Sequence, residues 1–80
     1  MPKRRPSSIL RAALRRKIRE RVAELDVTAA AAARRLGLSP AQMSRLNRDE
    51  DIFTLDRLID AAARIGLTTR LTATRPYRAG

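Results

Sequence analysis

The sequence contains no cysteine and no histidine among its 80 residues. Without cysteine there are no disulfide bonds and no thiolate chemistry, and a zinc site would have to be built from carboxylates alone. Without either residue type no nucleophile–base pair can be assembled, and no pair of carboxylates lies in a recognisable catalytic frame. We therefore expect a protein that is not an enzyme and that uses no cofactor and no metal.

Aromatic residues are also scarce, at 2% of the chain, whereas hydrophobic residues together make up 44%. This hydrophobic content favours a folded chain, whose core has to consist of leucine, isoleucine, valine and alanine. A chain of this length forms one domain and buries only about 60% of its unfolded surface, so a partner subunit would enlarge the core. No apolar run is long enough for a signal peptide or a transmembrane helix, which predicts a cytoplasmic protein without a membrane partner.

Positive charge is abundant, because 18 basic residues outnumber 8 acidic ones and leave a net charge of +10. Half of the basic residues precede residue 25. Such a balance favours a polyanionic partner, with nucleic acid as the first candidate and an anionic membrane surface as the second.

Residues 28–48 have the pattern of two short helices joined by a tight turn. Thr28 suits the N-cap of the first helix, and Gly37 suits its left-handed end. Ser39 and Gln42 have the spacing of a capping box for the second helix. Because a single residue separates the glycine from the new cap, the two helices have to cross steeply, as in a helix-turn-helix. The predicted helices are residues 29–36 and 40–47.

A longer helix is predicted over about residues 9–25, after a basic, proline-containing flexible arm formed by residues 1–8. The helix carries one apolar stripe, made of Leu10, Leu14, Ile18, Val22 and Leu25. Its other faces carry basic residues that are either solvated or in contact with phosphates: Arg11, Arg15, Arg16, Lys17, Arg19 and Arg21. An amphipathic helix on a membrane surface would have a similar pattern. In the arm, Lys3, Arg4 and Arg5 are candidates for DNA contact, the alternative being a disordered solubilising tail.

Acidic residues gather after the second short helix. Asp49, Glu50 and Asp51 do not fit a calcium-loop spacing, so we expect a solvated turn or a patch that faces a protein partner. A further helix is predicted over about residues 55–65, with Thr54 as its N-cap. This acidic side of the domain should face away from DNA or toward a basic protein.

Residues 67–75 are predicted to form one short β-strand, because apolar and polar residues alternate along them. A lone strand needs a partner for its backbone groups, and the simplest partner is the same strand of a second copy. This hypothesis assigns dimerisation to Leu67, Thr69, Leu71 and Ala73. The alternative is an extended tail packed on helix 55–65. Residues 76–80 are expected to be a mobile tail.

These elements predict an all-α domain of four to five helices over residues 9–66, followed by the short strand. The helix-turn-helix signature of the XRE family is matched by Thr28, Ala33, Leu36, Gly37, Leu38, Ser39, Met43, Ser44, Arg45 and Leu46. The chain therefore resembles the repressor-like DNA-binding domains of the Cro and phage-repressor type. The run over residues 53–67 resembles a subgroup of compact bacterial regulators that includes antitoxins of the HigA type.

The resemblance implies that helix 40–47 is the recognition helix and enters the major groove of double-stranded DNA. By position, it implies base-edge contacts by Pro40, Ala41 and Arg45, and phosphate or secondary base contacts by Gln42, Ser44 and Arg48. The caps Thr28 and Ser39 complete the predicted DNA-binding set. Ala29 departs from the family, which often has a phosphate-binding glutamine there, and this removes one anchoring contact.

The resulting hypothesis is a sequence-specific regulator that binds an inverted repeat as a homodimer, represses its own promoter, and is a candidate antitoxin with a toxin as protein partner. The alternative is a protein-interaction module derived from a helix-turn-helix, such as an antiactivator that binds another regulator. The sparse base-reading set and Ala29 favour that alternative.

Overall fold

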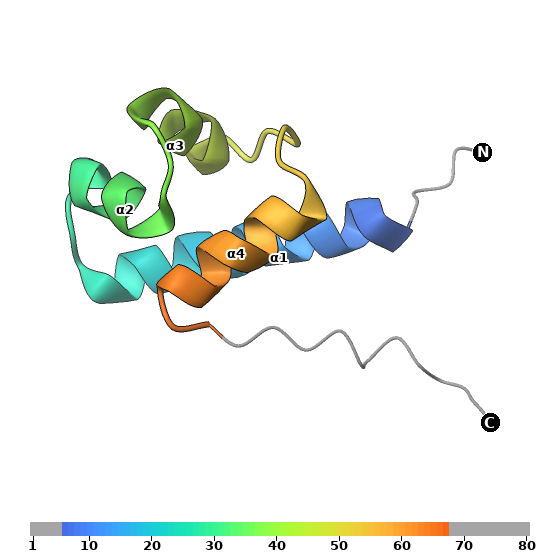
Figure 1. The fold of residues 1–80 in the computed structure, drawn as a ribbon, viewed down its shortest axis with the longest axis horizontal. Coiled ribbons are helices and arrows are strands. Elements are labelled where there is room, and N and C mark those ends of the chain that lie inside the picture. The colour runs from blue at the N-terminus through green and yellow to red at the C-terminus, as the bar shows by residue number, and fades with distance from the viewer. Residues whose placement is uncertain (1–5, 68–80) are drawn as a thin grey trace.

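The computed structural model of the chain describes residues 6–67. This part of the chain contains four helices and no strand, which confirms an all-α domain: α1 (Pro6–Leu25), α2 (Ala29–Leu36), α3 (Pro40–Asn47) and α4 (Leu55–Arg64). In Figure 1, α1 and α4 lie side by side, and α2 and α3 pack together next to this pair. None of the helices in this range is long and apolar enough to cross a membrane.

Helix α1 begins earlier than its apolar pattern predicts. It begins at Pro6, where proline is tolerated because the first-turn N–H has no partner within a helix. Residues 6–8, which were expected in the flexible arm, therefore belong to the helix. The candidate DNA-contacting residues Lys3, Arg4 and Arg5 lie outside the described residues.

The joint between α2 and α3 has the predicted geometry. Gly37 adopts a left-handed conformation with φ of 76°, and the Leu38 N–H donates to the carbonyl of Ala33 at 2.8 Å. One residue later the capping box is complete, since the Gln42 N–H donates to Ser39 Oγ at 3.1 Å and the Ser39 N–H donates to Gln42 Oε1 at 2.9 Å. These bonds satisfy helix-end groups on both sides of the turn, so they fix the entry of α3.

Helix α4 begins after the predicted cap Thr54 and ends in a second left-handed glycine, Gly66, with φ of 83°. The N–H of Leu67 donates to the carbonyl of Ala62 at 2.9 Å, and its side chain packs against the core. Leu67 therefore closes the helix end, and its assignment to dimerisation stays a prediction. The other predicted dimerisation residues, Thr69, Leu71 and Ala73, lie outside the described residues, as does the rest of the predicted strand.

Alanine residues allow the helices to pack closely. Ala32 and Ala33 of α2 and Ala61 and Ala62 of α4 are all buried, and α2 packs against both α3 and α4. Small side chains at these contacts let neighbouring backbones approach. The larger side chains of the core come from all four helices and the segments between them: Leu14, Ile18, Leu36, Leu38, Met43, Leu46, Phe53, Leu58 and Ile65.

Candidate nucleic-acid interface

The outer face of α3 is open to solvent. Its buried residues, Met43 and Leu46, point into the core, as predicted. The exposed residues are Pro40, Ala41, Ser44, Arg45, Asn47 and Arg48, while Gln42 is half-buried. Five of the predicted DNA-binding residues are thus accessible on this helix and its C-cap.

Three members of the predicted DNA-binding set already have structural roles. The side chain of Thr28 accepts a hydrogen bond from the Ala31 N–H at 3.1 Å, and Ser39 and Gln42 cap each other. Their side chains hold the starts of α2 and α3 in place. Arg45 and Arg48 are the two long cationic side chains of this surface, and both are exposed.

A shallow groove of about 390 Å³ lies between the N-terminal part of α2 and α3. Ala29 and Ala30 line it from α2, and Pro40, Met43 and Asn47 line it from α3. Its walls are mostly apolar, because the alanines present only methyl groups. The groove opens beside the short side chains of Ala29 and Ala30.

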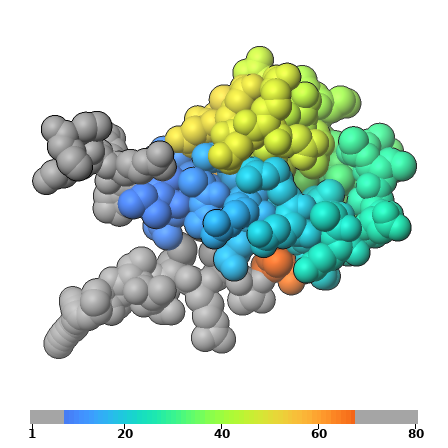
Figure 2. All heavy atoms as spheres, turned by 180° about the vertical axis from the view of Figure 1, so that it is seen from behind, coloured from blue at the N-terminus to red at the C-terminus, as the bar shows by residue number. Residues whose placement is uncertain are grey.

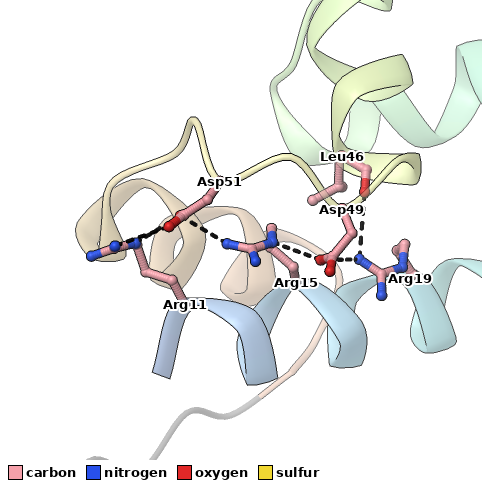
Figure 3. A network of polar contacts seen from close by, with 6 residues as sticks. All are labelled: Arg11, Arg15, Arg19, Leu46, Asp49 and Asp51. Carbon is pink, nitrogen blue, oxygen red and sulfur yellow. Dashed lines mark hydrogen bonds and ion pairs between the residues drawn. The ribbon is translucent and has the colours of Figure 1, made fainter. Parts of the chain in front are cut away.

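The acidic turn after α3 faces the protein itself. Figure 3 shows an arginine–aspartate ladder in which three arginines of α1 alternate with Asp49 and Asp51. Asp51 Oδ1 accepts from Arg11 Nε at 2.8 Å and from Arg15 Nη1 at 2.9 Å. Asp49 Oδ1 accepts from Arg15 Nε at 2.8 Å and from Arg19 Nη1 at 3.0 Å. Asp49 and Asp51 are 52% and 40% exposed, so the turn is solvated as predicted, but its two carboxylates also pair with α1. A solvated or phosphate-bound role is wrong for Arg15, which is buried.

The ladder ties the end of α3 to α1. Its centre, Arg15, is only 5% exposed, and a buried guanidinium requires such partners. Hydrogen bonds from Arg15 and then Arg19 lower the pKa of the Asp49 carboxyl, and the hydrogen bond from Arg11 lowers the pKa of Asp51. Both carboxylates stay ionised at neutral pH, so the ladder holds the C-terminal end of α3 against α1.

Asp49 also ends α3 in an unusual backbone conformation. It is left-handed, with φ of 61°, at a position where glycine is the common residue. The Asp49 N–H donates to the carbonyl of Leu46 at 2.9 Å, and the following Glu50 N–H donates to that of Arg45 at 3.0 Å. Aspartate tolerates this conformation better than most residues, and here its carboxylate also forms the ladder.

Much of the net positive charge belongs to residues that the structure does not describe. Residues 6–67 contain twelve basic and eight acidic residues, a net charge of +4, and the other six basic residues occur in residues 1–5 and 68–80. Within residues 6–67, four exposed basic residues make no hydrogen bond or ion pair: Arg16, Lys17, Arg34 and Arg35. Figure 2 shows α1 with the segment that follows α3 lying along it. Most of the basic surface of α1 is therefore used within the protein.

Comparison with known families matches residues 2–74 to a helix-turn-helix domain. The chain belongs to this helix-turn-helix family. The match supports the helix-turn-helix assignment and does not distinguish the XRE family or the HigA-type subgroup. In helix-turn-helix domains the second helix of the motif lies in the major groove of DNA, and here that helix is α3. Neither the curated proteins nor the solved structures gave a match.

Three features of this helix-turn-helix domain were missed at the sequence level. The sequence contains a pattern that could have indicated the ladder. Arginine recurs every fourth residue at Arg11, Arg15 and Arg19, which places the three side chains on one face of α1. Two further arginines bind helix-end carbonyls, with Arg21 Nε donating to Ile65 at 3.2 Å and Arg57 Nη2 donating to Gly37 at 2.9 Å. These long-range partners have no local signal in the sequence.

Proposed function

We propose that the chain is a sequence-specific DNA-binding regulator whose recognition helix is α3. It binds an inverted repeat as a homodimer and represses its own promoter. The observation that carries this proposal is the accessible surface of α3, on which Arg45 and Arg48 project from a helix whose opposite side is buried. A helix with small residues at its N-terminal end, such as Pro40 and Ala41, fits a major groove without steric hindrance.

Arg45 is the residue that we assign to base recognition. Its side chain is 52% exposed, and a guanidinium donates two hydrogen bonds to the O6 and N7 atoms of guanine. The basic residues of the chain ends would add phosphate contacts, which strengthen binding to every sequence. The resemblance to HigA-type regulators extends the proposal to an antitoxin role, in which a toxin would be the protein partner.

A second candidate function is a protein-interaction module that blocks another regulator. The groove between α2 and α3 favours it, because Ala29, Ala30 and Met43 give an apolar surface where a phosphate contact would be expected. The internal use of Arg11, Arg15 and Arg19 also reduces the cationic surface available to DNA.

Selection of bound duplexes from a random DNA library, at two salt concentrations, discriminates the two functions. A regulator enriches an inverted repeat with half-sites about one helical turn apart, and its affinity falls steeply with salt. A protein-only module enriches no site. On the selected site, Arg45→Ala should cost about 1–3 kcal/mol and relax the preference at one base pair per half-site. An equal loss on all sequences would show that Arg45 contacts only phosphate.

A further inference from the structure

Glu50 lies between the two arginines of the α3 surface. Arg48 Nε donates to Glu50 Oε2 at 3.0 Å, and Arg45 Nη1 lies 4.0 Å from Glu50 Oε1. Each carboxylate oxygen thus faces a different arginine. The Glu50 side chain is 37% exposed, less than Arg45 at 52% and Arg48 at 62%. Both arginine side chains are therefore more accessible than the carboxylate that they contact.

The backbone fixes Glu50 in this place. Its N–H donates to the carbonyl of Arg45 at 3.0 Å, and the neighbours Asp49 and Asp51 are both held by the ladder to α1. A carboxylate at the C-terminal end of a helix is unfavourable, because that end already carries partial negative charge. Its contacts with Arg45 and Arg48 offset this repulsion.

From this geometry we propose that Glu50 is a positioning residue that raises the sequence specificity of the α3 surface; the inference rests on the proposed DNA binding. A guanidinium has five N–H donors, and Glu50 takes the Nε donor of Arg48. The terminal nitrogens of Arg48 stay free to donate to a base edge. If either arginine moved toward a DNA phosphate, it would break its contact with the Glu50 carboxylate. The carboxylate would then lie unpaired near the negatively charged phosphate.

Glu50 therefore opposes binding through phosphates more than binding through bases. Non-specific complexes rely on phosphate contacts alone, whereas specific complexes add hydrogen bonds to base edges. Replacing the Glu50 carboxylate by an amide removes its repulsion of DNA phosphates and weakens its interactions with Arg45 and Arg48. The variant should bind unrelated DNA more tightly, without a matching gain on the selected site.

The test compares Glu50→Gln with Glu20→Gln, which removes the same charge from an exposed position on α1 that makes no ion pair within residues 6–67. Affinities are measured for the selected site and for a scrambled duplex at low and moderate salt. On the scrambled duplex, Glu50→Gln should make one more phosphate contact than Glu20→Gln. Its plot of log affinity against log salt concentration should then be steeper by about 0.9. The ratio of the two variants' affinities should therefore change about threefold between 50 and 200 mM salt. The ratio of specific to non-specific affinity should fall for Glu50→Gln and stay unchanged for Glu20→Gln.

A double substitution supplies a second readout. In an Arg48→Ala background, the effect of Glu50→Gln on scrambled DNA should shrink, because Glu50 acts through the guanidinium. Equal effects of Glu50→Gln and Glu20→Gln, or an unchanged specificity ratio, would overturn the inference and leave the proposed function standing. A wild-type chain that enriches no DNA site would overturn the proposed function and the inference together. Thermal unfolding of each variant by circular dichroism verifies that the compared chains are folded.

Discussion

Asp49→Asn tests whether the ladder stabilises the domain. Asparagine tolerates the left-handed conformation as aspartate does, so the substitution removes the charge and changes the backbone little. Hydrogen bonds between charged groups contribute about 1.5–3 kcal/mol, but Asp49 is 52% exposed, and exposed ion pairs contribute only about 0–1 kcal/mol. Arg15 keeps Asp51 as a partner. We therefore expect a loss of about 1 kcal/mol, which lowers the Tm of a domain of this size by about 4–8 °C.

The difference in stability between the wild type and Asp49→Asn should depend on pH in a defined direction. The pKa of Asp49 is lowered in the folded state by its hydrogen bonds from Arg15 and Arg19. A lowered pKa contributes stability that is complete above the unfolded value of about 3.9 and is lost as the pH falls through the folded value. Urea denaturation of both proteins, followed by circular dichroism, should therefore show a full difference near neutral pH and a shrinking one in acid.

The control variant is Asp49→Gly. This variant also lacks the carboxylate. Glycine, however, adopts positive φ without a steric penalty. That penalty is about 1–2 kcal/mol for an ordinary side chain and less for aspartate. The glycine variant should be more stable than the asparagine variant. If Asp49→Asn is as stable as the wild type at neutral pH, the ion pairs of Asp49 with Arg15 and Arg19 contribute no stability. A difference that persists undiminished in acid would place its cause in the backbone.

Three further perturbations test the packing and the chain ends. Ala33→Leu should destabilise the domain by about 1–3 kcal/mol in thermal or urea unfolding, because position 33 is only 3% exposed and has no room for three more carbons; an unchanged stability would mean that α2 is loosely packed. Removal of residues 1–5 should weaken DNA binding and flatten its salt dependence while the Tm stays constant, because α1 begins at Pro6; an unaltered slope would exclude phosphate contact by the arm. Removal of residues 68–80 should yield monomers in sedimentation if the predicted strand pairs two copies, whereas a truncated chain that stays dimeric would place the interface on the helices.

Features that depend on neighbouring residues were predictable. The capping box of Ser39 and Gln42 and the left-handed Gly37 are set by groups within a few residues of each other, and the structure has them at the expected positions. The exposed surface of α3 followed from the two apolar residues on its opposite face, Met43 and Leu46. Local hydrogen bonding and periodicity are enough to locate such features.

Features that depend on distant partners were not predictable. Arg15 and Asp49 are 34 residues apart in the sequence, and Arg11 and Asp51 are 40 apart. A basic residue on an amphipathic helix has the same local pattern whether it is solvated, bound to phosphate or paired with a distant carboxylate. Ala61 is buried, and the sequence does not indicate this for a related reason, since alanine is common on both the buried and the exposed faces of helices.

Under the proposed function, the uneven placement of charge assigns the two levels of DNA recognition to different parts of the chain. Within residues 6–67, whose net charge is only +4, α3 would present the side chains that distinguish one base pair from another. Residues 1–5 and 68–80 hold six basic residues and no acidic ones, so they would set how strongly any duplex attracts the protein. Lengthening, shortening or neutralising the ends, through evolution or through proteolysis, would then tune occupancy across a genome while the preferred site stayed the same.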